Sequence, residues 1–237
     1  MTARSLPPPP GVLRSFGGAV ADFVNNAWRF LLANIVFGVV LLCMALVVGS
    51  GSPVGYLLTL PMILPVAGLM RMAVVEVRQG RARFSDFLSP MRRPWTILAL
   101  GAVQLVAMFV MWIDVVVGLG SGDLLPAILA IGAVYILLAI WSYALVTWPL
   151  LLDPLRDGEP IRARLILGLH LLLAHPMRIL AIAIVAGALL ALSTAAIGIV
   201  VSFGLALIWL AIANFSIPLA DRFEGRLTAE ADVVDEE

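Results

Sequence analysis

The chain has no lysine, one cysteine, two histidines and few charged residues of any kind. Only 13% of its 237 residues are charged and 62% are hydrophobic, whereas a soluble domain has roughly 25% charged residues. The single cysteine, Cys43, excludes an internal disulfide and a cysteine-based metal site. The zero net charge gives no general attraction to nucleic acid. This composition is typical of a membrane protein.

Sequence motifs that carry enzyme chemistry are also missing. The chain has no P-loop and no glycine-rich dinucleotide motif. The serine in GLGSGD (residues 118–123) lacks the glycine of an intramembrane serine protease pattern, because Leu119 stands there. His170 and His175 lie about 140° apart around a helix, so they do not share a face as zinc ligands four residues apart would. We therefore predict a protein that is not an enzyme, with no catalytic residue, no metal site and no cofactor.

Apolar runs, by contrast, fill most of the chain. Four of them are long enough to cross a bilayer, and a fifth runs for 42 residues from Ile179 to Ala220. As one helix this fifth run would be roughly 63 Å long, about twice a bilayer core, so it must fold back. Ser193, Thr194 and Gly198 are the expected turn. The sequence predicts six spans, at about residues 28–48, 54–77, 95–119, 124–152, 178–194 and 196–220.

The predicted fold class is all-α: a polytopic membrane protein with a single membrane domain over residues 12–226. Residues 1–11 contain four successive prolines and are expected to form a disordered, Pro-rich N-terminus. Residues 227–237 are rich in acidic side chains and are expected to form a disordered tail.

The arginines give the orientation of the spans. All 15 basic residues are arginines, and in a six-span arrangement every one of them lies on the same side. The connections on the other side, at residues 49–53, at 120–123 and near Ser193, contain none. By the positive-inside rule, the arginine-bearing side and both chain termini face the cytoplasm.

The six spans resemble three similar helical hairpins. Each first helix follows a polar, amphipathic or proline-containing stretch, and segments 13–24, 84–88 and 162–175 are expected to lie on the membrane surface. Each returning helix carries proline near its expected cytoplasmic end, where proline would kink or end it. The pattern predicts a weak threefold repeat, unless prolines and arginines simply gather where helices leave the membrane. The prolines are Pro61, Pro65, Pro149 and Pro218.

Few polar side chains fall within the predicted spans, and these are the candidates for ligand contacts. Gln104 lies near mid-membrane and Asp114 near the outer interface; an interhelical hydrogen bond and a solvated aspartate are the alternatives. Polar and aromatic residues of the fourth and sixth spans would line a small cavity, unless they pack as an aromatic belt. The candidate ligand contacts are Gln104, Asp114, Tyr143, Thr147 and Asn214.

The stretch RQGRARFSDFLSPMRRP, residues 78–94, holds five arginines. It has three interpretations: a signal that keeps this loop in the cytoplasm, a contact with anionic lipid headgroups at roughly 1 kcal/mol per arginine, or a docking site for a protein partner. The two phenylalanines of FSDFL need an apolar surface, which can be lipid, the chain's own helices or a partner. The candidate docking residues are Arg81, Arg83, Phe84, Phe87, Arg92 and Arg93.

Four segments resemble the YesL-like family of bacterial multi-pass membrane proteins. They are FVNNAWRFLLANIVFG (23–38), LPMILPVAGLMR (60–71), GRARFSDFL (80–88) and YALVTWPLLLD (143–153). The resemblance covers about residues 16–222 and implies a location in the bacterial cytoplasmic (inner) membrane. The family has no assigned reaction and no catalytic residues to carry over. Some members are regarded as accessories to carbohydrate uptake, which implies a carbohydrate-related function here.

Two hypotheses for the function follow. The first is a non-enzymatic transport accessory or small-solute-binding membrane subunit, with the lipid bilayer, a transporter subunit or further copies of the same chain as partners. The second is a membrane assembly or scaffold factor that recruits a cytoplasmic partner through the arginine-rich loop. Nucleic acid is not an expected partner in either.

Replacing Arg81, Arg83, Arg92 and Arg93 together with neutral residues tests the arginine-rich loop. If the loop is a topology signal, a fraction of the molecules will insert with this loop on the wrong side, because positive charge near span ends sets orientation. Reporter fusions in residues 80–92 and 120–123 measure that fraction. Unchanged topology with loss of a bound partner would instead identify the loop as a docking site.

Overall fold

The computed structural model describes residues 11–49, 60–92, 94–195 and 204–234. Its regular structure in these ranges is helical and contains no strand, which confirms the all-α prediction. The α-helices are α1 (Val12–Asn25), α2 (Ala27–Gly49), α4 (Ile63–Gln79), α5 (Phe84–Leu88), α6 (Pro94–Gly120), α7 (Leu124–Leu151), α8 (Ile161–Ala174), α9 (Pro176–Ala195) and α11 (Leu205–Val234). Short 3-10 helices lie between them: η1 (Leu60–Met62), η2 (Ser89–Arg92) and η3 (Pro154–Arg156).

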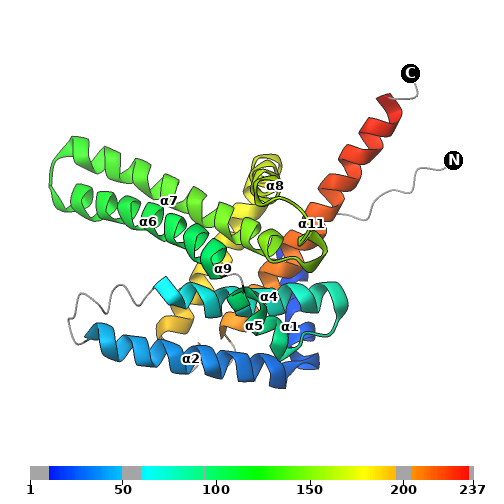
Figure 1. The fold of residues 1–237 in the computed structure, drawn as a ribbon. Helices are drawn as coiled ribbons and strands as arrows, with labels where there is room; N and C mark the ends of the chain where they lie inside the picture. Colours follow the sequence, from blue (N-terminus) through cyan, green and yellow to red (C-terminus); the bar gives the residue numbers. More distant parts are fainter. Residues whose placement is uncertain (1–10, 50–59, 93, 196–203, 235–237) are drawn as a thin grey trace.

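These helices follow one another as three units, each a short helix and then two long ones (Figure 1). The units are α1–α2–α4, α5–α6–α7 and α8–α9–α11. The last helices of the units, α4, α7 and α11, contact one another. They carry fully buried side chains such as Leu69, Leu145 and Leu210. We call α4, α7 and α11 the central helices.

The contacts between the units repeat in a cyclic order. Each short helix packs on the central helix of the preceding unit: α5 on α4, α8 on α7, and α1 on α11, which closes the circle. Each middle helix contacts the central helix of its own unit and that of the preceding one. Thus α2 contacts α4 and α11, α6 contacts α7 and α4, and α9 contacts α11 and α7.

The sharp bends between short and long helices have local causes. Helices α8 and α9 meet at 102°, at His175 and Pro176; the residue before a proline avoids the helical region, and proline suits the first position of a new helix. Helices α1 and α2 meet at 93°, at Asn26. The Asn26 side chain donates a hydrogen bond to Oε1 of the buried Glu76 at 2.6 Å, which ties this bend to α4.

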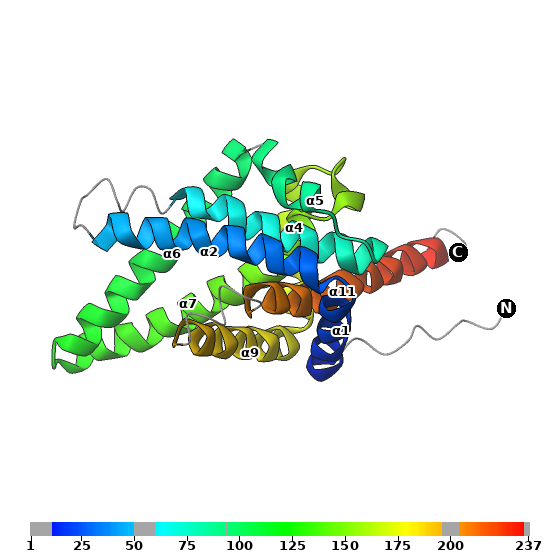
Figure 2. The same cartoon turned by 90° about the horizontal axis from the view of Figure 1, so that it is seen from below.

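The long helices are compatible with a multi-pass membrane protein. Four described helices are long and apolar enough to cross a bilayer, and the number rises to six if each bent pair is one span. Helices α6 and α7 form a hairpin that projects from the rest of the molecule (Figures 1 and 2). Most of its exposed side chains are apolar, with Phe109 63% and Leu129 65% exposed. Such a large exposed apolar surface is unfavourable in water and suits contact with lipid.

Two chain segments differ from the sequence prediction. Ser193 and Thr194 belong to α9, which reaches Ala195, so the fold-back of the long apolar run starts later than predicted. Gly198 lies outside the described residues. Helix α11 continues to Val234 and so passes through most of the segment predicted to be a disordered tail. Residues 227–231, LTAEA, are mostly good helix formers, so extending the helix costs little.

Of the prolines predicted to kink or end the returning helices, Pro149 lies at a helix end, Pro61 and Pro65 do not, and a kink at Pro218 stays a prediction. Pro149 lies in the last turn of α7, which ends at Leu151. Pro61 and Pro65 lie at the start of the described part of their helix, in η1 and the first turn of α4, where a missing N–H breaks no helical hydrogen bond. Pro218 lies inside α11 and does not end it.

Glycine permits the close approach of α4 and α5. A Cβ atom added at Gly68 would collide with the backbone oxygen and the ring of Phe87, which is fully buried. We predict that Gly68→Ala lowers the free energy of unfolding by about 1–3 kcal/mol, because a backbone atom cannot move aside. Thermal unfolding in detergent measures the change. Gly17→Ala is the matched control, since nothing lies within 4 Å of its added Cβ; equal effects at both positions would contradict the prediction.

Candidate functional site

An apolar chamber of about 550 Å³ lies among the long helices of all three units. Its size is within the range of about 300–1,000 Å³ that is usual for small-molecule sites. Residues of α2, η1, α4, α6, α7, α9 and α11 line it. Representative wall residues, one from each long helix, are Phe37, Met70, Met108, Leu145, Leu190 and Ile208.

Small residues shape the chamber wall, either by letting two helices approach closely or by leaving the interior open. Gly101 of α6 is buried against Ile63, because a Cβ added there would come within 2.6 Å of the Ile63 Cγ2. Helix α6 therefore touches the start of α4 closely at this point. Ala144 of α7 and Ala186 of α9 also belong to the wall, and their short side chains leave the interior open.

Four polar side chains interrupt the apolar wall, and three of them are tryptophans. The Trp148 indole N–H donates to Gln104 Oε1 at 2.6 Å, and the Trp141 indole N–H donates to the backbone oxygen of Ala183 at 3.1 Å. The indole nitrogen of Trp209 is buried and has no hydrogen-bond partner among the described residues. The N–H groups of Trp141 and Trp148 are therefore engaged with neighbouring protein groups and do not face a ligand.

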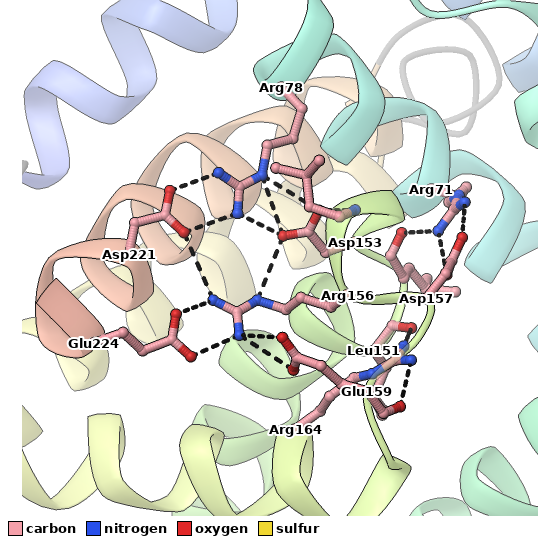
Figure 3. A network of polar contacts seen from close by, with 12 residues as sticks. Arg71, Arg78, Leu151, Asp153, Arg156, Asp157, Glu159, Arg164, Asp221 and Glu224 are labelled. Atoms are coloured by element: carbon pink, nitrogen blue, oxygen red, sulfur yellow. Dashed lines mark hydrogen bonds and ion pairs between the residues drawn. The ribbon is translucent and has the colours of Figure 1, made fainter. Parts of the chain in front are cut away.

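A cluster of ion pairs joins the three central helices at one end (Figure 3). Its members are Arg78 of α4, Asp153 and Arg156 after α7, and Asp221 and Glu224 of α11; we call them the ion-pair cluster. Arg78 donates to Asp153 and to Asp221, each with a shortest distance of 2.6 Å. Arg156 donates to both carboxylate oxygens of Glu224 and lies 3.6 Å from both Asp153 and Asp221.

The ion-pair cluster is largely removed from solvent. Asp153 is fully buried, and the side chains of Arg156 and Arg78 are 6% and 14% exposed. The hydrogen bonds to Glu224 raise the pKa of the Arg156 guanidinium above its ordinary value, although burial acts in the opposite direction. Arg156 therefore stays charged, and its partners supply the compensation that a buried cation needs.

Two further arginines bind the carboxyl end of α7. Arg71 of α4 donates to the backbone oxygen of Leu152 at 2.5 Å and to Asp157 at 2.8 Å. Arg164 of α8 donates to the backbone oxygen of Leu151 at 2.8 Å. The last carbonyl groups of a helix lack partners within it and carry partial negative charge, so these cations satisfy and stabilise the end of α7.

The structure brings only one of the predicted ligand contacts to the chamber wall, namely Gln104. Tyr143 donates to the backbone oxygen of Leu165 at 3.0 Å, so it faces α8 instead. Thr147 is buried against Gly168 of the same helix. These two residues therefore lie where a short helix packs on a central helix.

The other two predicted contacts also lie away from the chamber. Asn214 donates to Asp22 at 2.8 Å and lies against Gly18, so it faces α1. Asp114 is exposed on α6. Tyr143, Thr147 and Asn214, which lie in the predicted fourth and sixth spans, thus serve contacts between helices.

The predicted docking residues fall into two groups: the phenylalanines pack within the fold, and the described arginines are exposed. Phe87 is fully buried against α4 and stacks on the half-buried Phe84, with 5.5 Å between the ring centroids. The chain's own helix α4 therefore supplies part of the apolar surface that these two phenylalanines need. Arg81, Arg83 and Arg92 are exposed, and Arg93 lies outside the described residues.

Sequence reasoning missed the ion-pair cluster. Arg78 belongs to the predicted basic loop, and the acidic residues of LLDPLRDGEP (151–160) and LADRFEG (219–225) carry no predicted role. The available signal was an Asp–Pro pair directly after an apolar run, since Asp153 caps η3 by accepting from the Leu155 N–H. Arg71 and Glu76, inside the predicted second span, were a second signal, because charges there need partners.

Comparisons with known proteins give no relative on which to base a function. No protein-family model, no curated protein and no solved structure matches the chain. The resemblance to the YesL-like family gains no support from them and stays a prediction. Among the described residues, no group of three histidine, cysteine or acidic side chains is arranged to hold a metal ion.

Breaking the ion-pair cluster at Asp153 tests how much the fold depends on it. We predict that Asp153→Asn lowers the free energy of unfolding by about 3–5 kcal/mol, because it deprives the buried Arg156 and the largely buried Arg78 of a shared counter-charge. Asp157→Asn is the control, because the Asp157 carboxylate pairs with Arg71 but is 58% exposed. Loss of this exposed ion pair should cost at most about 1 kcal/mol. Thermal unfolding in detergent compares the two variants, and equal losses would contradict the assigned role.

Proposed function

We propose that this chain is a non-enzymatic, six-span protein of the bacterial cytoplasmic (inner) membrane that binds a small solute, as a subunit or accessory of a transport system. The observation that carries the proposal is the apolar chamber, which is lined by the long helices of all three units. The described lining residues include no ionisable side chain, which favours binding over catalysis.

The proposed topology counts α2, η1–α4, α6, α7, α9 and α11 as the six spans. The ion-pair cluster and the arginines of α4, η3 and α8 would then lie at the cytoplasmic end, together with both chain termini. The positive-inside rule supports this orientation. The short helices α1, α5 and α8 would lie at the cytoplasmic interface, where the bends of 93° and 102° turn the chain into the bilayer.

We further propose that the three units are repeats of one ancestral hairpin preceded by a short helix. The cyclic contacts support this proposal, because each short helix packs on the central helix of the unit before it. Glycine enables a close approach at all three contacts: Gly18 between α1 and α11, Gly68 between α4 and α5, and Gly168 between α8 and α7. A chance gathering of prolines and arginines would not produce this order.

The chemistry of the chamber limits the solute. A carbohydrate needs many hydrogen bonds in a binding site, whereas this wall is apolar apart from one glutamine and three indoles. The chamber therefore does not favour the carbohydrate-related function that the family resemblance implies, and it favours an apolar solute. A scaffold function through the arginine-rich loop has less support, because Phe87 is buried against α4 and does not offer its ring to a partner.

Filling the chamber tests the proposed function. We predict that the wild-type protein, purified in mild detergent, retains a small molecule in native mass spectrometry. Ala186→Phe and Leu190→Trp, which place larger side chains in the chamber wall, should reduce its occupancy several-fold. Ala188→Phe is the matched control, since Ala188 is exposed on the same helix and does not line the chamber. A wild-type protein without a bound molecule, or unchanged occupancy in both variants, would overturn the proposal.

A further inference from the structure

The side-chain amide of Gln104 is oriented by its neighbour. The indole N–H of Trp148 donates at 2.6 Å to the atom assigned as Oε1. An indole nitrogen is only a donor, so the atom that faces it must be the carbonyl oxygen of the amide. The amide NH₂ group of Gln104 must then point away from Trp148.

This NH₂ group has a poor partner in the described protein. Its hydrogen bond goes to the Met108 sulfur at 3.8 Å, one turn further along α6, and a thioether is a weak acceptor. Gln104 is half-buried and lines the chamber. The chamber wall therefore offers an oriented N–H donor with unused capacity.

The depth of Gln104 makes this donor significant. It lies ten residues after Pro94, the start of α6, which is about 15 Å along the helix and close to the middle of a bilayer core. Water is scarce at that depth, and a polar group without a full partner is costly there. An acceptor on a bound molecule would remove this cost.

We propose that the chamber binds a neutral molecule with an apolar chain and a carbonyl oxygen, which accepts a hydrogen bond from the Gln104 amide. The proposal rests on the solute-binding function above and names the class of solute. The described lining residues include no cation, which disfavours an anionic headgroup or a free fatty-acid carboxylate inside the chamber, since its charge would stay unpaired there. Met62, Met70 and Met108 supply flexible, polarisable walls that adapt to a chain.

Trp148 is a positioning residue in this site. Its N–H holds the Gln104 amide so that the NH₂ group, whose protein partner is only the weak acceptor Met108 sulfur, can donate to the ligand. Without that N–H the amide can turn over and present its oxygen, which repels a carbonyl. Trp141 also lines the chamber, but its N–H is engaged with Ala183, so it has no comparable effect on Gln104.

Two probes of equal chain length test the proposal. Tetradecan-2-one has a carbonyl oxygen and tetradecane does not, and each is titrated into the purified protein in detergent micelles while the shift in Tm is recorded. For the wild-type protein we expect the ketone to bind about tenfold more tightly than the hydrocarbon, the value of one buried hydrogen bond. Gln104→Leu should bind both probes equally, and Trp148→Phe should lose most of the preference. Trp141→Phe should keep it.

The outcomes separate this inference from the proposed function. If the wild type binds both probes equally, the role of Gln104 is wrong and the chamber remains a binding site. If neither probe raises Tm, the proposed function fails as well. Binding of tetradecane by Gln104→Leu shows that this variant is folded, and Gln104→Met replaces it if it is not. A ketone preference that survives in the folded Gln104 variant overturns the inference.

Discussion

The fold depends on the placement of Asp153, a fully buried carboxylate between two arginines from different parts of the chain. Arg78 reaches it from the end of α4, and Arg156 lies beside it in η3. Both arginines also pair with α11, through Asp221 and Glu224. One compact group of charges thus joins the end of α4 and the segment after α7 to the middle of α11, and these three helices are otherwise held together by apolar contacts that many arrangements could satisfy.

Buried ion pairs are weak evidence for stability, because the desolvation of each charge offsets much of the attraction. In this fold the ion pairs fix how the helices are positioned against one another. An apolar helix can slide or rotate against its neighbours at little cost, whereas Arg78 meets Asp153 and Asp221 together only in one register. The glycine contacts also favour a single register. Phe87 packs against α4 at Gly68, where the missing side chain leaves room for it, and the larger side chains at neighbouring positions of α4 would not.

The sequence predicts the parts of this fold that depend on neighbouring residues. Apolar runs predict the long helices, and the stretches before them predict the short helices α1, α5 and α8. Contacts between residues far apart in the sequence cannot be predicted in this way. Arg78 lies 75 residues from Asp153 and 143 from Asp221, so no local pattern connects them. Asn214 and Thr147 were recognised as polar residues in apolar helices, but the helix that each one faces belongs to another unit.

The chamber and the ion-pair cluster share the three central helices, and a neighbouring arginine, Arg71, ties α4 to the end of α7 beside the chamber. On α4, Met70 lines the chamber and the next residue, Arg71, binds the carboxyl end of α7. On α7, Trp148 lines the chamber, and Leu152, four residues later, accepts the hydrogen bond from Arg71. Movement of α4 against α7 would therefore break charge-assisted hydrogen bonds within one helical turn of the chamber. The polar end of the molecule thus holds Trp148, and through it the amide of Gln104, in a defined position.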